Sequence, residues 1–144
     1  MQSYRVELTP TAQKAYEEIY ADAQACIEAG NGSNAKVATL RMVDDAIDNI
    51  IPHDPLAIRN ALSGPLSNLY RVKKGRLRIY YAASSKERKA VILFISQTLR
   101  KAGDVNDPYS IFTRLVMTGR FDQVFAQLNI RIPPRHNLQP PRTQ

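Results

Sequence analysis

A cationic segment that coincides with a predicted β-hairpin is the feature that most constrains the fold. Residues 69–73 and 76–82 are rich in β-branched, aromatic and basic residues in the pattern of two strands, and Lys74-Gly75 between them has the composition of a tight turn. Because side chains on a strand point alternately to opposite faces, one face of this hairpin is apolar and the other is cationic. Residues 70–101 contain a single acid, Glu87, among ten bases: Arg71, Lys73, Lys74, Arg76, Arg78, Lys86, Arg88, Lys89, Arg100 and Lys101.

Positive charge is concentrated in residues 70–101, which carry +9, although the whole chain carries only +7. Residues 1–69 carry −4, and residues 102–144 carry +2. A surface that needs charge only for solubility mixes both signs, so this concentration predicts a polyanionic partner. For each single residue, the alternative is that it forms the solvated side of a sheet. For the whole set that alternative is weaker, because like charges that face each other across strands destabilise a sheet.

The length of 144 residues and the apolar content of 44% predict one globular domain. The first ten residues, MQSYRVELTP, lack the pattern of a signal peptide, so a cytoplasmic location is expected. Cys26 is the only cysteine, which excludes an internal disulfide and a multi-cysteine metal site. The two histidines, His53 and His136, have no ligand spacing, and no metal or other cofactor is expected.

The residues before the hairpin predict a strand and two helices. Residues 4–8 alternate in the manner of a strand, and Thr9-Pro10 then supplies an N-cap and a proline for the first helical position. Apolar residues at helical spacing continue to Gly30, which ends this helix. A second helix is predicted to begin near Asn34 and to be stopped by Pro52, so that the two form a helical hairpin.

The remaining elements follow from turn signals and apolar runs. Residues 53–68 are predicted to be mostly loop, with a short helix at 56–62. An apolar run at 90–95 predicts a central strand, and residues 96–106 a loop. Asp107-Pro108 repeats the N-cap and proline pattern and predicts a helix that ends at Gly119, with another short helix at 121–128.

The element order is β-α-α-β-β-β-α, which predicts an α+β fold: a small antiparallel β-sheet with the N-terminal helical hairpin packed on one face. The apolar side of the sheet, with Val72 and Ile79, is expected to face these helices. A single domain is predicted for residues 1–130, followed by a disordered, basic and proline-rich tail at 131–144. The other side of the sheet is expected to stay open and to carry Arg71, Lys73, Arg76, Arg78 and Tyr80, a surface suited to phosphates and a stacked base.

Three short motifs follow one another in this chain: LSG at residues 62–64, LYRVK at 69–73 and LRIYY at 77–81. With the element order, they resemble the core of the RelE/ParE superfamily of toxins from toxin–antitoxin systems. The segment TLRKAGDVNDPYSIF at residues 98–112 is similar to the YhaV branch of that superfamily. The resemblance extends over residues 62–120 and implies a RelE-like fold, with the preceding strand and helices agreeing in pattern only.

The resemblance implies the toxin of a type II toxin–antitoxin system that cleaves mRNA, commonly in the ribosomal decoding site, and so inhibits translation. Such an endoribonuclease drives a ribose 2′-hydroxyl onto the adjacent phosphate without a metal, and it needs cations to stabilise the transition-state charge. By position in the motifs, Arg78 and Arg100 would clamp the scissile phosphate and Tyr109 would stack on a nucleotide. Lys73 completes the expected catalytic set, and the expected RNA-binding residues are Arg71, Lys74, Arg76, Tyr80 and Lys101.

The residue that takes the proton of the 2′-hydroxyl stays open. Arginine remains protonated, so Arg78 and Arg100 would stabilise charge and make poor bases. Lys73 is a better candidate, because neighbouring arginines disfavour its charged form. Asp104 or Asp107 could act instead, although Asp107 precedes a proline at the place where a helix N-cap belongs.

Three other functions are compatible with the same residues, and one of them is a toxin remnant that acts only by binding a partner protein. The ParE branch of the same fold poisons DNA gyrase, and a non-catalytic nucleic-acid-binding module would need only the cationic face. The presence of Arg78, Arg100 and Tyr109 favours the nuclease, although Tyr109 in the first turn of a helix has packing as an alternative role. The expected partners are mRNA on the ribosome and a cognate antitoxin of an acidic or DNA-binding type, and no membrane is expected.

Overall fold

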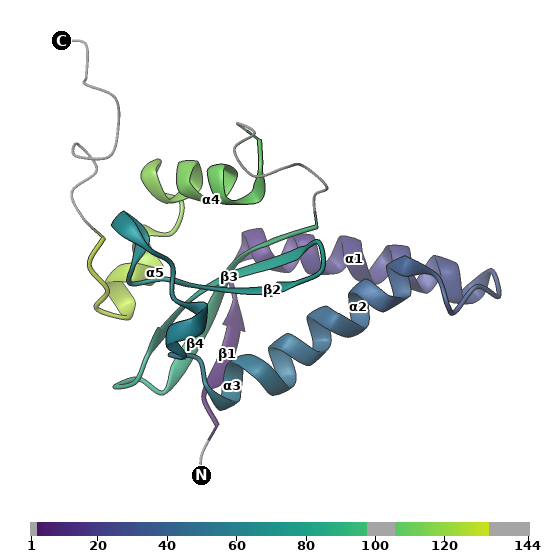
Figure 1. Cartoon of the computed structure of the whole chain (residues 1–144), viewed down its shortest axis with the longest axis horizontal. Coiled ribbons are helices and arrows are strands. Elements are labelled where there is room, and N and C mark those ends of the chain that lie inside the picture. Colours follow the sequence, from purple (N-terminus) through teal and green to yellow (C-terminus); the bar gives the residue numbers. More distant parts are fainter. Residues whose placement is uncertain (1–2, 98–105, 133–144) are drawn as a thin grey trace.

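The computed structural model describes residues 3–97 and 106–132, whose strands form one four-stranded sheet (Figure 1). In order across the sheet the strands are β1 (Arg5–Leu8), β4 (Lys89–Ser96), β3 (Leu77–Ser84) and β2 (Tyr70–Lys74). Strands β2, β3 and β4 are antiparallel, as predicted, whereas β1 runs parallel to β4. The predicted α+β fold is confirmed, and the parallel edge strand is a detail that the element order alone does not contain.

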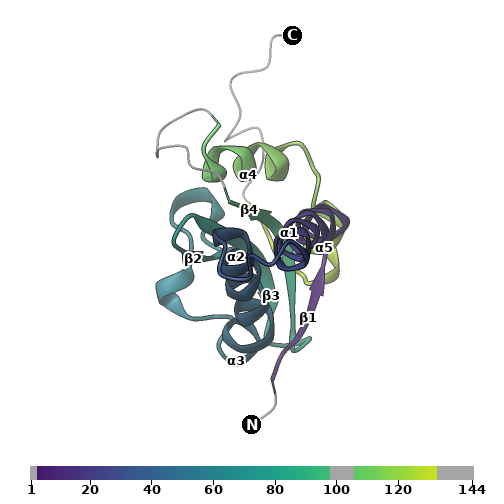
Figure 2. The same cartoon turned by 90° about the vertical axis from the view of Figure 1, so that its right-hand side faces the viewer.

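Two long helices between β1 and β2 form the predicted helical hairpin and lie side by side in both views (Figures 1 and 2). They are α1 (Pro10–Glu28) and α2 (Ala35–Asp45). The side chains of Thr9 and Asn34 cap them. Thr9 accepts a hydrogen bond from the N–H of Ala12 (3.1 Å), and Asn34 accepts one from the N–H of Lys36 (2.8 Å).

The second helix passes through a wider turn before it ends. A π-helical turn at Ala46–Ile50 is followed by the single turn α3 (Ile51–His53), and the N–H of Ile51 bonds to the carbonyl of Ala46. Pro52 therefore lies inside the last turn and does not stop the helix, which ends one residue later. A proline ring in an α-helix clashes with the carbonyl four residues earlier, and the wider turn gives it room.

The other predicted helices are present with small differences. A 3₁₀ turn at Ile58–Asn60 replaces the short helix expected at 56–62, and a second 3₁₀ turn follows at Gly64–Leu66. After β4, the helices α4 (Pro108–Met117) and α5 (Asp122–Gln127) match the predictions for 107–119 and 121–128. None of the helices in the described part of the chain is long and apolar enough to cross a membrane.

Apolar side chains fill both faces of the sheet. On one face, Ile79 and Tyr81 pack against the helical hairpin. On the other face, Tyr80 and Leu93 join a cluster with residues of α4 and α5, including Phe112. The sequence predicted that the face of the sheet opposite the helical hairpin is open. That prediction is wrong where α4 and α5 cover this face. These helices carry apolar stripes that must be buried, and the first face is already occupied by α1 and α2.

Two predicted segments fall mainly outside the described residues. Of the loop expected at 96–106, the structure describes only residues 96, 97 and 106. Of the tail expected at 131–144, it describes only Arg131 and Ile132. The carbonyl of Arg131 accepts a hydrogen bond from Asn68 Nδ2 (2.7 Å). Ile132 packs against the cluster beneath α4 and α5, so these two residues contact the domain.

Candidate nucleic-acid interface

The register of the β2–β3 hairpin brings three of the predicted cations onto one face. Val72 pairs with Ile79, and both are buried against the helical hairpin. Since neighbours along a strand point to opposite faces, the adjacent residues point away from those helices. These are Arg71, Lys73 and Arg78, which we call the cationic strip; Lys73 and Arg78 are direct partners across the two strands. Their common face agrees with the prediction.

Arg78 is held in place by the turn that joins the two strands. Its Nη1 group donates hydrogen bonds to the carbonyls of Gly75 (2.5 Å) and Leu77 (3.0 Å). Gly75 has a φ of +56°, which glycine adopts without strain and which lets the chain reverse here. The Nε and Nη2 groups of Arg78 make no hydrogen bond to a described residue. One edge of the guanidinium is therefore available to an anion.

Arg76 does not lie on the face of the cationic strip. The turn consists of Gly75 and Arg76, one residue later than predicted, and this places Arg76 outside the strand. The prediction that Arg76 shares a face with Arg78 is therefore wrong. Lys74, the last residue of β2, is exposed and pairs with the buried Leu77. Arg76 lines a cavity of about 210 Å³ with Ala35, Lys36, Thr39, Met42, Leu77 and Gln97.

The ring of Tyr80 is buried, although an exposed ring was predicted. Tyr80 is 0% exposed, and the ring of Phe112 in α4 stacks on it with a centroid distance of 4.3 Å. Phe94 of β4 lies on the same face, with its ring centroid 5.9 Å from that of Tyr80. A nucleobase cannot stack on a ring covered in this way, so the predicted stacking role of Tyr80 is wrong. The signal for this burial is the apolar stripe of α4, in which Phe112 and Val116 lie one turn apart.

The hydroxyl of Tyr80 lies next to the cationic strip. Burial raises the pKa of this hydroxyl, and the neighbouring Arg71 guanidinium opposes the shift. The charge of Arg78 also acts to lower that pKa, whereas the carboxylate of Asp107 acts to raise it. Because the pKa is raised overall, the hydroxyl is protonated at neutral pH.

The first turn of α4 lies beside the same part of the sheet. Asp107 is its N-cap, only 6% exposed, and its carboxylate accepts a hydrogen bond from the N–H of Ser110 (2.7 Å). Tyr109 is half-buried and packs against the cluster under α4, as its alternative role requires. Its stacking on a nucleotide stays a prediction. Arg100 and Lys101, the other two predicted site residues, lie outside the described residues.

Two substitutions of Asp107 separate capping from catalysis. Asp107→Ala removes the N-cap, so we expect the free energy of unfolding to fall by about 1 kcal/mol. Asp107→Asn keeps a capping oxygen but cannot take up the proton as a carboxylate does, so we expect near-normal stability and full RNA cleavage. Urea unfolding and a cleavage assay measure the two effects. Loss of cleavage by a stable Asp107→Asn protein would identify Asp107 as the base instead.

Metal-ligating side chains are scattered over the described residues. Cys26 is partly buried on α1, and His53 is exposed at the end of α3. Across residues 3–97 and 106–132, no three His, Cys, Asp or Glu side chains gather in a way that could hold an ion. The charge on the described face of the candidate interface comes from Arg and Lys side chains.

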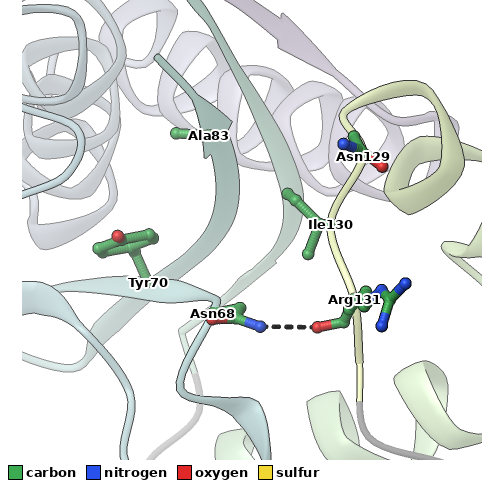
Figure 3. Close-up of a pocket in the computed structure, with 6 residues that line it drawn as sticks. All are labelled: Asn68, Tyr70, Ala83, Asn129, Ile130 and Arg131. Carbon is green, nitrogen blue, oxygen red and sulfur yellow. Dashed lines mark hydrogen bonds between the residues drawn. The ribbon is translucent and has the colours of Figure 1, made fainter. Parts of the chain in front are cut away.

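Another cavity lies at the start of β2 and is drawn in Figure 3. Its volume is about 460 Å³. Figure 3 shows the amide of Asn68 bonded to the carbonyl of Arg131, with the Tyr70 ring to one side. None of the predicted site residues lines this cavity, so it is separate from the cationic strip. Its lining residues are Asn68, Tyr70, Ala83, Asn129, Ile130 and Arg131.

Two solved structures from toxin–antitoxin systems are similar to this chain. One is the toxin–antitoxin complex RelBE2 from Mycobacterium tuberculosis, with a TM-score of 0.51 and 18% identity over 69% of this chain and 97% of that chain. Another is the isolated RelE toxin of E. coli, with a TM-score of 0.45 and 14% identity over 79% of this chain and 99% of that chain. The first of these likenesses places the chain in the class of RelE-like folds.

The family follows from the sequence match. Residues 7–131 match the family model of the YhaV toxins, described as toxins with endonuclease activity of a toxin–antitoxin system. Because this match covers most of the chain, the protein belongs to the YhaV toxin family and is a toxin with endonuclease activity. The resemblance of residues 98–112 to the YhaV branch is thereby confirmed. None of the curated proteins matches the chain in sequence.

Proposed function

We propose that this protein cleaves mRNA in the cytoplasm, in association with the ribosome and without a metal ion, and thereby stops translation. The observation that carries the proposal is the cationic strip. Arg71, Lys73 and Arg78 face the same side, and no described acid forms an ion pair with them. Such a strip attracts the phosphate backbone of RNA. Membership of a family described as toxins with endonuclease activity supports a nuclease over a module that only binds.

In the proposed reaction, the ribose 2′-oxygen attacks the adjacent phosphorus and the bond to the 5′-oxygen breaks. The products are a 2′,3′-cyclic phosphate and a 5′-hydroxyl, with one proton taken from the 2′-hydroxyl and one given to the leaving oxygen. Arg71, Arg78 and Arg100 would stabilise the charge on the phosphate oxygens. Lys73 is the proposed base, because an arginine cannot take up the proton. Of the two other candidates, Asp104 lies outside the described residues, and Asp107 is the buried N-cap of α4.

Other side chains around the strip would hold the RNA. Tyr109, in the first turn of α4, would stack on a nucleotide beside the scissile phosphate. Lys74, at the end of β2, and Lys101 would contact neighbouring phosphates and add affinity without selecting a sequence.

A cognate antitoxin is the second proposed partner, because a free toxin of this kind would halt translation in its own host. The family belongs to toxin–antitoxin systems, and the structure of similar fold from Mycobacterium tuberculosis is a toxin–antitoxin complex. The antitoxin would cover the cationic strip with acidic side chains or displace the first turn of α4. Either contact would keep RNA away from Arg78.

Primer extension on an mRNA in a purified translation system tests the proposal. With wild-type protein, we expect new 3′ ends when ribosomes are present and few or none when they are absent. A message with a 2′-deoxyribose at the mapped site is expected to stay intact, because the attacking oxygen is missing. The cleaved natural message is expected to end in a 2′,3′-cyclic phosphate.

Three other outcomes would change the proposal in different ways. Cleavage of the 2′-deoxy message at the same site would contradict the 2′-hydroxyl mechanism. Equal cleavage without ribosomes would remove the ribosome from the reaction. Intact messages and continuing translation would favour a non-catalytic binding module or a gyrase poison.

A further inference from the structure

One buried polar atom beside the cationic strip has no hydrogen-bond partner. Among the described residues, the hydroxyl oxygen of Tyr80, Oη, is fully buried and makes no hydrogen bond. The next residue shows the ordinary case, because the hydroxyl of Tyr81 donates to the carbonyl of Pro55 (2.7 Å). Leaving a buried hydroxyl unsatisfied costs free energy, so such atoms are rare and call for an explanation.

The ring of Tyr80 holds this hydroxyl in a fixed position. It stacks on Phe112 of α4, with a centroid distance of 4.3 Å, and the tilted ring of Phe94 in β4 lies 5.9 Å away. In a close-packed cluster the ring cannot turn toward another partner without opening these contacts. A group that is to bond with Tyr80 Oη must therefore come to it.

Arg71 is the group best placed to do so. Arg71 is the direct partner of Tyr80 across the β2–β3 ladder, and its guanidinium is close enough to influence the ionisation of the hydroxyl. The Arg71 guanidinium lies close enough to the Tyr80 hydroxyl to act on it as a hydrogen-bond donor and oppose the rise of its pKa, but the two groups do not reach hydrogen-bond geometry. Arg78, in contrast, is anchored by the turn carbonyls. Arg71 therefore lacks an anchor of full hydrogen-bond geometry, and Tyr80 Oη has a donor beside it that is not yet bonded to it.

We propose that Tyr80 is a positioning residue, whose hydroxyl accepts a hydrogen bond from the Arg71 guanidinium when RNA is bound and so directs Arg71 at a phosphate. A phosphate on the outer edge of the guanidinium removes water from that side chain. Its inner N–H groups then bond to the fixed oxygen below, and both groups gain a partner. This inference rests on the RNA partner of the proposed function and does not depend on the chemistry of cleavage.

Tyr80→Phe tests the hydroxyl, because it keeps the stacked ring. The probe is a fully 2′-O-methylated single-stranded RNA, which cannot be cleaved by 2′-hydroxyl attack, and fluorescence anisotropy at fixed salt measures its affinity. We expect the affinity to fall about 3- to 10-fold, the range for one lost hydrogen bond. The melting temperature is expected to stay unchanged or to rise, because the substitution removes an unsatisfied buried atom.

Tyr81→Phe is the matched control. It makes the same change one residue away, on the opposite face of β3, and it removes a satisfied hydrogen bond. We expect a lower melting temperature and unchanged RNA affinity. In an Arg71→Ala background, Tyr80→Phe is expected to cause no further loss, because the hydroxyl acts through Arg71.

Two results would overturn the inference: equal affinity of wild type and Tyr80→Phe, or a full additional loss in the Arg71→Ala background. A parallel cleavage assay keeps the proposed function separate. A wild-type protein that binds the probe but does not cleave mRNA contradicts the nuclease, while the Tyr80 comparison still decides the inference. A wild-type protein that neither binds nor cleaves overturns both.

Discussion

Replacement of Arg78 by alanine is expected to slow RNA cleavage by about 10²- to 10³-fold, the usual loss when one donor to the transition-state charge is removed. The guanidinium of Arg78 is fixed by two carbonyls at the hairpin turn and presents its Nε and Nη2 edge on the cationic strip. RNA affinity is expected to fall far less, because Arg71 and Lys73 remain on the same face. Time courses of primer extension, with binding of 2′-O-methylated RNA in parallel, measure the two effects.

Lys86→Ala controls for the loss of one positive charge. Lys86 is exposed in the turn between β3 and β4, at the end of β3 away from Gly75. We expect this variant to cleave at nearly the wild-type rate. Arg78→Lys keeps the charge but loses the two-pronged donor edge, so an intermediate rate is expected. Thermal unfolding of each variant shows whether loss of the bonds to the turn has weakened the fold.

A folded Arg78→Ala protein that cleaves at the wild-type rate would contradict the assigned role. Equal losses of affinity and of cleavage would show instead that Arg78 is an ordinary binding cation. In that case the slope of log affinity against log salt would become shallower by about 0.7, the contribution of one phosphate contact to a single strand. The two outcomes distinguish a catalytic arginine from a binding one.

The faces of the β2–β3 hairpin could be predicted because alternation along a strand is a local property. A turn at Lys74-Gly75 would place Lys73 opposite Arg76, whereas Lys73 pairs with Arg78 in the structure. This is a shift of two residues, and an even shift leaves every side chain on its face. The shift moved Arg76 from the strand into the turn and Lys74 from the turn into β2.

The burial of the sheet face opposite the helical hairpin could not be predicted, because it depends on contacts between residues that are distant in the sequence. Nothing next to Tyr80 distinguishes a ring exposed among cations from one buried under a helix, and Phe112 decides between them from α4. The parallel pairing of β1 with β4 is likewise set by how α1 and α2 carry the chain across the sheet. The missing partner of Tyr80 Oη is a property of the packed structure, and no pattern in the sequence carries it.

Phe112→Ala is expected to lower the free energy of unfolding by about 3–5 kcal/mol, the usual cost of emptying a buried phenylalanine site. Phe112 is 0% exposed, and its ring contacts those of Tyr80 (4.3 Å) and Phe121 (6.0 Å). It therefore joins α4 both to the sheet and to the segment before α5. Domains of this size are stable by roughly 5–15 kcal/mol, so the variant is expected to fold marginally. Urea denaturation followed by circular dichroism measures the loss.

The functional part of this prediction concerns the start of α4, where the N-cap Asp107 and the first-turn residue Tyr109 lie beside the cationic strip. Under conditions where Phe112→Ala is folded, we expect cleavage below wild type, because α4 has lost its anchor over Tyr80. Phe112→Leu fills much of the same space and is expected to lose less of both stability and cleavage. Ile58→Ala, at a side chain 89% exposed, is the surface control and is expected to change neither. If Phe112→Ala is as stable as wild type, the packing of α4 on the sheet is contradicted. If the variant is destabilised but cleaves normally, α4 does not contribute to the site.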